Sequence, residues 1–510
     1  MSGFLYKSLF ASAHKFEDKL SLCFDTGANL SFKDFLNEVY KCINYLKAFS
    51  LTKGDIVFAA IGTKIKFCVL VYACNALDII VVPISTKLKD DGVAHLLITI
   101  SPKIIFYDDT YQSFIPDLAK ATTKSDIKCI SLQNFIYSSS QAITNEDALS
   151  LKDDYDDEAT AIIMFTSGTT SSPKGAVISN HNLNAAVLAY EDGLQLRSDD
   201  STILGVPIFH ITGLVAILAL FVHIGGTIYL EQRFKPNRIL LLIKRYKISF
   251  LHGSPTVFAL LHQENMQKLG STYPSLKSIA CGAGRLNRGV INSLKSMFPN
   301  SQVHSVYGLT ESTSPFTLYR GDVSLLKNAD SSGTLVKNAY IKICNDNGET
   351  LPTNTVGTIW IAGDMVIKSY FPVTDSNKRL FSNGFLNTGD VGYIDDNGNL
   401  YVKDRVKDII NKGGEKIFCP EVESLISTFD GVVEVALVAK DDDLYGEVPI
   451  AYLKVKSAKD FDIESLILFL KKHLPKFQIP VEYKFIDDFP RTNNGKINKR
   501  QLRKICNLKA

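Results

Sequence analysis

The sequence predicts an α/β protein: a large N-terminal domain of α/β layers plus a β-rich module, and a small α+β C-terminal domain. Up to about residue 300, short apolar strand-like runs such as DIVFAAIG (55–62) alternate with helix-like runs such as KFCVLVYACNAL. This alternation is typical of α/β layers around a mainly parallel sheet. After about residue 330, runs such as VGYIDDNGNLYVKDR read as strands joined at Asn-Gly hairpin turns.

The last part of the chain has a different pattern. VVEVALVAK and IAYLKVK read as strands, and DIESLILFLKKHL reads as an amphipathic helix. A stretch of about 100 residues is large enough for a domain of its own. We therefore place a domain boundary near Arg405, which divides the chain into residues 1–404 and 405–510.

Charge and hydropathy exclude several classes of protein. The 56 basic and 53 acidic residues leave a net charge of +3, which gives no general attraction to nucleic acid or anionic membranes. The most membrane-like run is residues 211–230. It contains His223, two adjacent glycines and the β-prone tail TIYL, so we expect a buried helix followed by a buried strand, not a transmembrane segment. The N-terminus lacks the unbroken apolar core of a secretory signal.

The nine cysteines are scattered and form no CxxC pair. An odd, unpatterned set in a long chain is typical of reduced thiols in a cytoplasmic protein. It does not favour a zinc site or a disulfide framework.

Residues 166–176, TSGTTSSPKGA, combine six hydroxyl side chains with glycines and one lysine. Glycines let the backbone approach a ligand, and hydroxyl, N–H and ammonium groups bind phosphate oxygens. The buried run ATAIIMF (159–165) would deliver this loop to a sheet edge. The lysine precedes the glycine, so this is not a Walker loop, and a flexible surface loop remains an alternative. The candidate phosphate-binding residues are Thr166, Ser167, Gly168, Thr169, Thr170 and Lys174.

Four further motifs follow in order: YGLTES (307–312), TGD (388–390), DRVKDIINKGGEKI (404–417) and PRTNNGKINKR (490–500). Together with TSGTT they resemble the adenylate-forming enzymes, a family that includes acyl-CoA synthetases, firefly luciferase and peptide-synthetase adenylation domains. The resemblance spans the whole chain. It implies a reaction in which ATP and Mg²⁺ convert a carboxylic acid into an acyl-adenylate, which CoA then attacks. It also implies a mobile C-terminal domain.

The resemblance assigns roles within YGLTES. Tyr307 would lie against adenine, Gly308 would belong to the same nucleotide site, and Thr310 would bind the α-phosphate. Glu311 would hold Mg²⁺, for which a hard oxygen ligand is suitable. On the residues alone, a strand-to-loop turn with one surface glutamate is the alternative.

The same resemblance suggests residues for the nucleoside. Asp390 would accept hydrogen bonds from the ribose hydroxyls, and Arg405 would reach the ribose as well. Gly282 and Ala283, in CGAGRLN, would contact adenine. A turn aspartate and a surface arginine are the alternatives without this context.

Near the C-terminus, Lys496 resembles the catalytic lysine, whose charge would stabilise the transition state between the carboxylate and the α-phosphate. Lys407 falls at the position of the family's hinge. Gly413 and Gly414 would leave room for the pantetheine arm of CoA. His210, in the acid-pocket segment PIFHITGL, completes the candidate catalytic residues, and no acid in that segment would hold a substrate ammonium.

Two positions depart from the family pattern: Ser171 replaces a glycine, and Arg285 stands where proline is common. The leading function is an acyl-CoA synthetase for a fatty or aryl acid. The alternatives are an acyl-AMP ligase that loads an acyl carrier protein and a non-catalytic nucleotide-binding relative.

Overall fold

The computed structural model describes residues 3–25, 27–85, 88, 90–111, 115–122, 127–137, 156–166, 174–267, 270–326, 330–491 and 496–507. The chain divides into two compact units. The first comprises Met1–Tyr340 and Ala362–Gly384, and the second comprises Ile341–Ile361 and Phe385–Ala510. No helix within the described ranges has the length and apolar character that crossing a bilayer requires.

The described residues of the first unit include a sheet of seven strands. They are β3 (Ile56–Ala60), β4 (Ile80–Pro83), β5 (Ile104–Tyr107), β6 (Lys128–Ser131), β7 (Thr160–Thr166), β8 (Lys174–Ser179) and β18 (Tyr370–Phe371). The strand order is β18-β8-β7-β4-β3-β5-β6, with β3 to β7 parallel and β8 and β18 antiparallel to their neighbours. The predicted parallel α/β layer is therefore confirmed.

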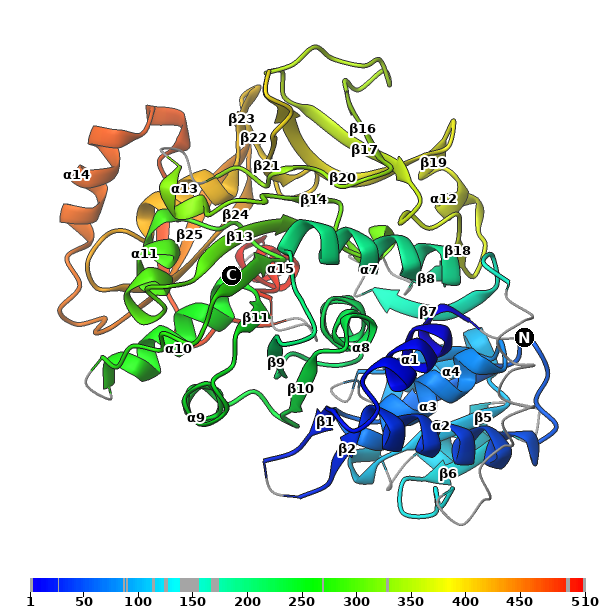
Figure 1. The fold of residues 1–510 in the computed structure, drawn as a ribbon. Coiled ribbons are helices and arrows are strands. Elements are labelled where there is room, and N and C mark those ends of the chain that lie inside the picture. Colours follow the sequence, from blue (N-terminus) through cyan, green and yellow to red (C-terminus); the bar gives the residue numbers. More distant parts are fainter. Residues whose placement is uncertain are drawn as a thin grey trace. The chain divides into compact units, whose positions relative to one another are not determined.

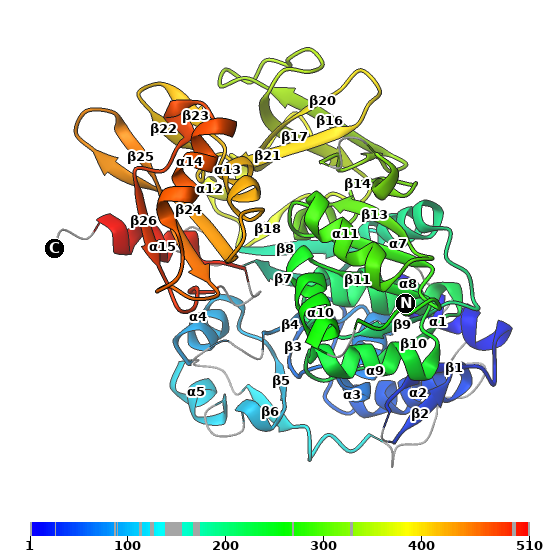
Figure 2. The same ribbon diagram turned by 90° about the vertical axis from the view of Figure 1, so that its left-hand side faces the viewer.

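Helices cover both faces of this sheet, as Figure 2 shows for α2 and α3 on one side and α4 and α5 on the other. These helices are α2 (Phe32–Lys47), α3 (Ile65–Ala76), α4 (Asp90–Ile100) and α5 (Ile115–Thr122). A capping box starts α2, because Ser31 Oγ accepts from Asp34 N at 3.0 Å and Ser31 N donates to Asp34 Oδ2 at 3.3 Å. Every residue of α3 after Lys66 is buried, as in a helix packed inside the protein.

A second sheet of nine strands occupies the rest of the first unit's described residues. Its strands are β1 (Leu20–Cys23), β2 (Asn29–Ser31), β9 (Ser201–Leu204), β10 (Thr227–Leu230), β11 (Phe250–Gly253), β12 (Ser278–Gly282), β13 (Gln302–Tyr307), β14 (Thr317–Leu318) and β15 (Thr334–Leu335). The order is β15-β14-β13-β12-β11-β9-β10-β1-β2. Among these described strands β2 and β14 run against the direction of the others, and β15, which pairs antiparallel with β14, runs in the same direction as β13. The carboxyl ends of β11, β12 and β13 therefore meet at one edge.

The helices around the second sheet are α1 (Phe4–Lys15), α7 (Asn180–Leu194), α8 (Leu220–Ile224), α9 (Pro236–Tyr246), α10 (Pro255–Gln267) and α11 (Arg288–Met297). α9, α10 and α11 bury Ile243, Leu261 and Ile291 in one hydrophobic core against β11 to β13. α1 contacts α2 and α3 as well as α7 and α8, so it lies between helices that belong to the two sheets (Figure 1).

The membrane-like run of the sequence forms a π-helix (η2, Thr212–Ala219), then α8, then β10, and most of it is buried. The prediction of a buried helix followed by a strand is confirmed. The remaining short elements of the first unit are η1 (Asp109–Tyr111), η3 (Thr310–Ser312), η4 (Val323–Leu325), α12 (Asp375–Lys378) and β19 (Phe381–Ser382).

The second unit begins with the predicted hairpin module. Its strands are β16 (Ala339–Cys344), β17 (Gly357–Gly363), β20 (Phe385–Ile394) and β21 (Leu400–Arg405). β20 pairs with β17 and with β21, antiparallel in both cases. Gly398 has φ +77° in the turn between β20 and β21, which is the positive φ that the Asn-Gly pattern predicts.

A five-stranded sheet forms the rest of the second unit's described residues. Its strands are β22 (Ile410–Lys412), β23 (Glu415–Ile417), β24 (Val432–Asp442), β25 (Gly446–Val455) and β26 (Glu482–Phe485). The helices are α13 (Cys419–Ile426), α14 (Ile463–His473), η5 (Lys476–Gln478) and α15 (Lys499–Asn507). α13 and α14 pack into one core with β24 and β25, and α15 packs into a separate core against the same two strands. This arrangement confirms the predicted α+β composition.

All nine cysteines lie in described parts of the chain. Eight are buried, and Cys129 is partly exposed. Burial raises the pKa of the Cys23 thiol to about 11 and also raises the pKa values of Cys68 and Cys281.

Candidate functional site

The hydroxyl-rich loop follows β7, as predicted, and β8 begins at Lys174. Ser167, Gly168, Thr169, Thr170 and the side chain of Thr166 lie outside the described residues, so their roles stay predictions. Lys174 Nζ lies 5.6 Å from the centre of the Tyr370 ring, on the strand that pairs with β8. The ammonium group of Lys174 therefore lies where this loop ends and β8 begins.

Glu311 lies in η3, just beyond the end of β13. The hydroxyl of Tyr370 donates to Glu311 Oε1 at 3.0 Å. The backbone oxygen of Glu311 accepts from Ile367 N at 2.9 Å. Residues 367 and 370 therefore bind the backbone and the side chain of Glu311, respectively. Through Tyr370, the structure brings Glu311 and Lys174 to the same neighbourhood of the first unit.

This carboxylate fits a magnesium ligand. It is partly exposed and carries hard oxygen atoms, and Tyr370 fixes its orientation. No group of three His, Cys, Asp or Glu residues that could enclose a metal occurs in the described part of the chain. A site with one protein carboxylate matches Mg²⁺ bound mainly by phosphate oxygens and water. Thr310 and Tyr307 are likewise partly exposed beside Glu311.

The predicted adenine segment begins where β12 ends. A Cβ at Gly282 would lie 2.9 Å from Val306 O, so only glycine fits there without a shift. Ala283 is exposed and has φ +61°, in the left-handed region. Arg285, at the unusual position, pairs with Asp330 at 2.5 Å. The two candidate residues thus lie at the carboxyl edge of the sheet, and adenine contact stays a prediction.

His210 precedes the π-helix η2. It is partly buried, and its ring lies 4.7 Å from that of Phe209. A Cβ at the neighbouring Gly213 would lie 2.4 Å from Pro207 O, so this segment is tightly packed. The structure supports a rigid wall here, and a catalytic role for His210 stays a prediction.

Asp390 and Arg405 stand opposite each other on β20 and β21 in the second unit. Arg405 Nε donates to Asp390 Oδ1 at 3.1 Å, and Asp390 is buried. The two predicted ribose-binding residues therefore form one charged pair on a hairpin, with the carboxylate held in place by the guanidinium.

Lys496 is an exposed residue whose ammonium group is influenced by the charges of both members of this pair. Desolvation and the like charge of Arg405 lower the pKa of Lys496, and Asp390 opposes the shift. Three predicted residues, far apart in sequence, thus interact within one compact unit. Asn494 and Gly495, which precede Lys496, lie outside the described residues.

Gly413 and Gly414 form the turn between β22 and β23, with φ of +61° and +91°. Both values are unfavourable for residues with a side chain. The Gly413 N–H donates to Tyr445 O at 2.8 Å, which fixes the turn against the loop before β25. Passage of the pantetheine arm beside this turn stays a prediction.

Sequence reasoning missed a buried polar group in the first unit. Tyr190 OH lies 3.3 Å from His252 Nε2 and 2.7 Å from Ser314 Oγ. Within the described residues, His252 Nδ1 has no hydrogen-bond partner. Desolvation lowers the pKa of His252 to about 4, so the ring is neutral. The sequence feature that could have indicated this group is His252 itself, a polar residue at the end of the mainly apolar run ISFLH (248–252). Tyr370 was missed as well, because no motif marks it.

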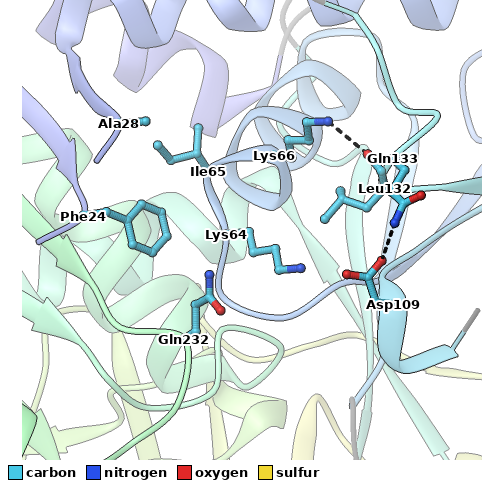
Figure 3. Close-up of a pocket in the computed structure, with 9 residues that line it drawn as sticks. All are labelled: Phe24, Ala28, Lys64, Ile65, Lys66, Asp109, Leu132, Gln133 and Gln232. Carbon is cyan, nitrogen blue, oxygen red and sulfur yellow. Dashed lines mark hydrogen bonds between the residues drawn. The ribbon is translucent and has the colours of Figure 1, made fainter. Parts of the chain in front are cut away.

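A pocket of about 440 Å³ lies elsewhere in the first unit, between the loop after β1, the start of α3 and the end of β6 (Figure 3). Phe24, Lys64, Ile65 and Gln232 are among its lining residues. Lys66 turns away to donate to Leu132 O at 3.0 Å. The lining includes no predicted site residue, so this pocket is separate from the candidate site.

Comparison with known proteins identifies the family. Residues 9–371 match the sequence profile of the AMP-binding enzymes, and residues 421–496 match that of the AMP-binding enzyme C-terminal domain. The chain belongs to the AMP-binding enzyme family. Within this family it is an AMP-forming acid–CoA ligase, and the resemblance read from the five motifs is confirmed.

Two AMP-binding enzymes illustrate the similarity in sequence. The 2-succinylbenzoate–CoA ligase of Bacillus licheniformis is 30% identical over 475 residues, covering 93% of this chain and 94% of the relative. The long-chain-fatty-acid–CoA ligase FadD13 of Mycobacterium tuberculosis is 27% identical over 466 residues, covering 91% and 90%.

Two solved structures agree with the fold. The o-succinylbenzoate CoA synthetase of Bacillus subtilis, in complex with the acyl-adenylate intermediate OSB-AMP, has a TM-score of 0.85 and 26% identity over 97% of both chains. MatB of Rhodopseudomonas palustris with ATP bound has a TM-score of 0.89 over 99% of both chains. At 24% identity, MatB supports the fold alone.

Proposed function

We propose that this AMP-forming acid–CoA ligase activates a fatty or aryl carboxylic acid. ATP and the acid give an acyl-adenylate and pyrophosphate, and CoA then gives the acyl-CoA and AMP. The observation that carries the proposal is the electrostatic grouping of Lys496 with Asp390 and Arg405. In this grouping the ammonium of Lys496 would act near a carboxylate suited to a ribose diol.

The first half-reaction needs electrostatic stabilisation of phosphoryl transfer, not a covalent protein intermediate. Asp390 would accept hydrogen bonds from the ribose hydroxyls, and Arg405 would hold that carboxylate ionised and oriented. Lys496 would offset the repulsion between the substrate carboxylate and the α-phosphate. Glu311, oriented by Tyr370, would hold Mg²⁺, which supplies positive charge for the phosphate oxygens when bound.

In the second half-reaction the thiol of CoA must reach the acyl-adenylate, so the residues around the nucleotide must rearrange. We propose that residues 405–510 act as a mobile domain that reorients about Lys407 after the adenylate forms, with residues 1–404 as the adenylation domain. A few backbone dihedrals at such a pivot absorb a large rotation. The thiol of CoA would then approach beside Gly413 and Gly414.

The nature of the acid rests on two observations. The segment around His210 carries no carboxylate that would pair with a substrate ammonium, so amino acids are poor candidates. The relatives named above act on 2-succinylbenzoate and on long-chain fatty acids. They are CoA ligases, and an acyl carrier protein is not favoured as the acceptor.

The test is ATP–pyrophosphate exchange with a panel of short, medium, long and aromatic acids, followed by thioester formation with free CoA. Exchange with an aryl or fatty acid, and acyl-CoA as the product, is expected. Exchange with none of the acids would contradict the proposal. Exchange without acyl-CoA formation would remove CoA as the acceptor.

A further inference from the structure

Three contacts in the second unit join the residues just before Lys407 to the helices that follow it. The first is an ion pair between strand β21 and helix α13: Lys403 Nζ lies 2.7 Å from Glu421 Oε1. Both side chains are largely shielded, with 25% and 27% of their surface exposed. Such a pair is screened less than one on an open surface.

The second contact is a helix cap supplied from a distance. Asp404 Oδ2 accepts from Cys419 N, the first residue of α13, at 2.7 Å. The N-cap residue Phe418 provides no side-chain cap in the described structure. Asp404 therefore satisfies a helix N–H that would otherwise lack a partner side chain. Its negative charge is also stabilised by the positive N-terminal end of the helix dipole.

The third contact is electrostatic and involves Lys499, a partly exposed lysine that interacts with two carboxylates. Lys499, the first residue of α15, lies 2.7 Å from Glu423 Oε1 in α13 and interacts electrostatically with Asp404. Desolvation opposes the charge of Lys499, but the carboxylates of Glu423 and Asp404 raise its pKa. α15 begins three residues after Lys496. This cluster therefore ties the segment that carries Lys496 to β21.

The segment at the pivot is also fixed. Arg503, in α15, donates from Nη1 to the backbone oxygen of Lys407 at 3.0 Å. In this arrangement Lys496 interacts with Asp390 and Arg405. The contacts across Lys407 and the placement of the catalytic cation therefore occur together.

We propose that Lys403 and Asp404 are positioning residues that form a latch across Lys407 and hold Lys496 where adenylate formation needs it. The inference rests on the proposed reorientation about Lys407. A rotation there must break bonds between residue 403 or 404 and residues 419, 421 and 499, because the two groups lie on opposite sides of the pivot. The latch therefore favours one of the two orientations and is released for thioester formation.

Weakening the latch should change the populations of the two orientations in opposite directions. The ratio of the thioester-forming rate to the adenylate-forming rate reports this shift. A change that merely loosens the fold would lower both rates and leave their ratio unaltered.

The experiment measures the two half-reactions separately in the full-length protein. Pyrophosphate exchange reports adenylate formation, and acyl-CoA formation from supplied acyl-adenylate reports the second step. Desolvation raises the pKa of Asp404 to about 7, against the opposing effect of Lys499, so assays at about pH 8 keep the carboxylate mainly ionised. The variants are Asp404→Ala and Lys403→Met. Asp404→Asn, which keeps an acceptor for Cys419 N, serves if Asp404→Ala does not fold.

A matched control breaks an ion pair that does not cross the pivot. Lys440 in β24 pairs with Glu482 in β26 at 3.1 Å, so Lys440→Met removes a similar contact and leaves β21 intact. We expect Asp404→Ala to raise the rate ratio about tenfold, as the loss of a helix cap implies, Asp404→Asn and Lys403→Met to raise it severalfold, and Lys440→Met to leave it unchanged.

Three outcomes separate the possibilities. If the wild-type protein catalyses neither half-reaction, the proposed function is wrong. If the wild type catalyses both, and the latch variants lower both rates in proportion or change neither, the latch is wrong. An equal rise of the ratio in Lys440→Met would also overturn it, because the effect would not depend on the pivot.

Discussion

Asp390 and Arg405 occupy facing positions on antiparallel strands, and the guanidinium Nε donates to the carboxylate Oδ1 at 3.1 Å. The pair is asymmetric: Asp390 is 7% exposed and Arg405 45% exposed. A buried carboxylate oriented by a more accessible cation is suited to recognising neutral hydroxyl donors, since a carboxylate has two oxygens that accept hydrogen bonds.

Asp390→Asn should weaken binding of the nucleotide more than that of the acid. Loss of charge-assisted hydrogen bonds costs on the order of 1.5–3 kcal/mol, so kcat/KM for ATP should fall roughly 10- to 100-fold. Pyrophosphate exchange at varied ATP measures this. Asp396→Asn, in the turn of the same hairpin, is the control, and a similar fall there would contradict the assignment.

Lys496→Ala should abolish adenylate formation and spare thioester formation from supplied acyl-adenylate. Removing one preorganised charge from a phosphoryl-transfer site costs about 10²- to 10³-fold in rate. The two half-reactions are assayed separately, with Lys459→Ala, an exposed lysine of the same unit, as the control. Equal losses in both half-reactions would show that Lys496 does not have the role assigned to it.

Lys407→Pro should impair one half-reaction selectively, because proline fixes φ near −65° and so restricts the pivot. Lys407→Ala keeps the backbone free and should retain both. The readout is again the pair of half-reaction rates. Normal rates for both steps in the proline variant would rule out a hinge at this residue.

Glu311→Gln should raise the Mg²⁺ concentration needed for half-maximal pyrophosphate exchange, since an amide is a weaker ligand than a carboxylate. Tyr370→Phe, which removes the 3.0 Å bond to Glu311 Oε1, should have the same effect on a smaller scale. A Mg²⁺ titration tests both, with Glu158→Gln as the control, and an unchanged Mg²⁺ requirement in Glu311→Gln would exclude it as the ligand.

His252 should make the stability of the first unit depend on pH. Its pKa is about 4 in the fold against 6.5 in free imidazole. The unfolded chain therefore binds the proton first, and the contribution of neutral His252 is complete above pH 6.5 and is lost as pH falls toward 4. The loss is roughly 3 kcal/mol.

Urea unfolding at a series of pH values measures this effect. His252→Phe should flatten the dependence between pH 6.5 and 4, and exposed His95→Phe should not. Identical pH profiles for the wild type and His252→Phe would mean that the ring is not neutral in the fold.

Local pattern was sufficient for most of the architecture. Apolar runs bounded by polar turns became the parallel strands, and the Asn-Gly turn before Asn399 became the turn between β20 and β21. The register set at this turn continues only to Gly392, and a shift between Val391 and Gly392 then sets Asp390 opposite Arg405. The Asn-Gly pattern therefore predicted the hairpin but not the charged pair, which depends on this irregularity. The run at 211–230 was interpreted correctly, because its glycines and β-prone tail outweighed its hydropathy.

Contacts between distant segments were not predictable in the same way. Tyr370 reaches Glu311 only because the two-residue strand β18 pairs with β8, and no local pattern indicates that pairing. His252 reads as an ordinary end of a strand until the sheet sets it beside α7. The boundary near Arg405 stays a prediction. The compact second unit also includes residues 385–404.

The burial of the cysteines has a chemical consequence for an acid–CoA ligase. An activated acyl group is transferred to whichever thiolate meets it first, and an accessible protein cysteine would compete with CoA for it. Eight of the nine thiols are buried and Cys129 is partly exposed, so few protein thiols can compete with CoA. We therefore expect little acylation of the enzyme's own cysteines during turnover.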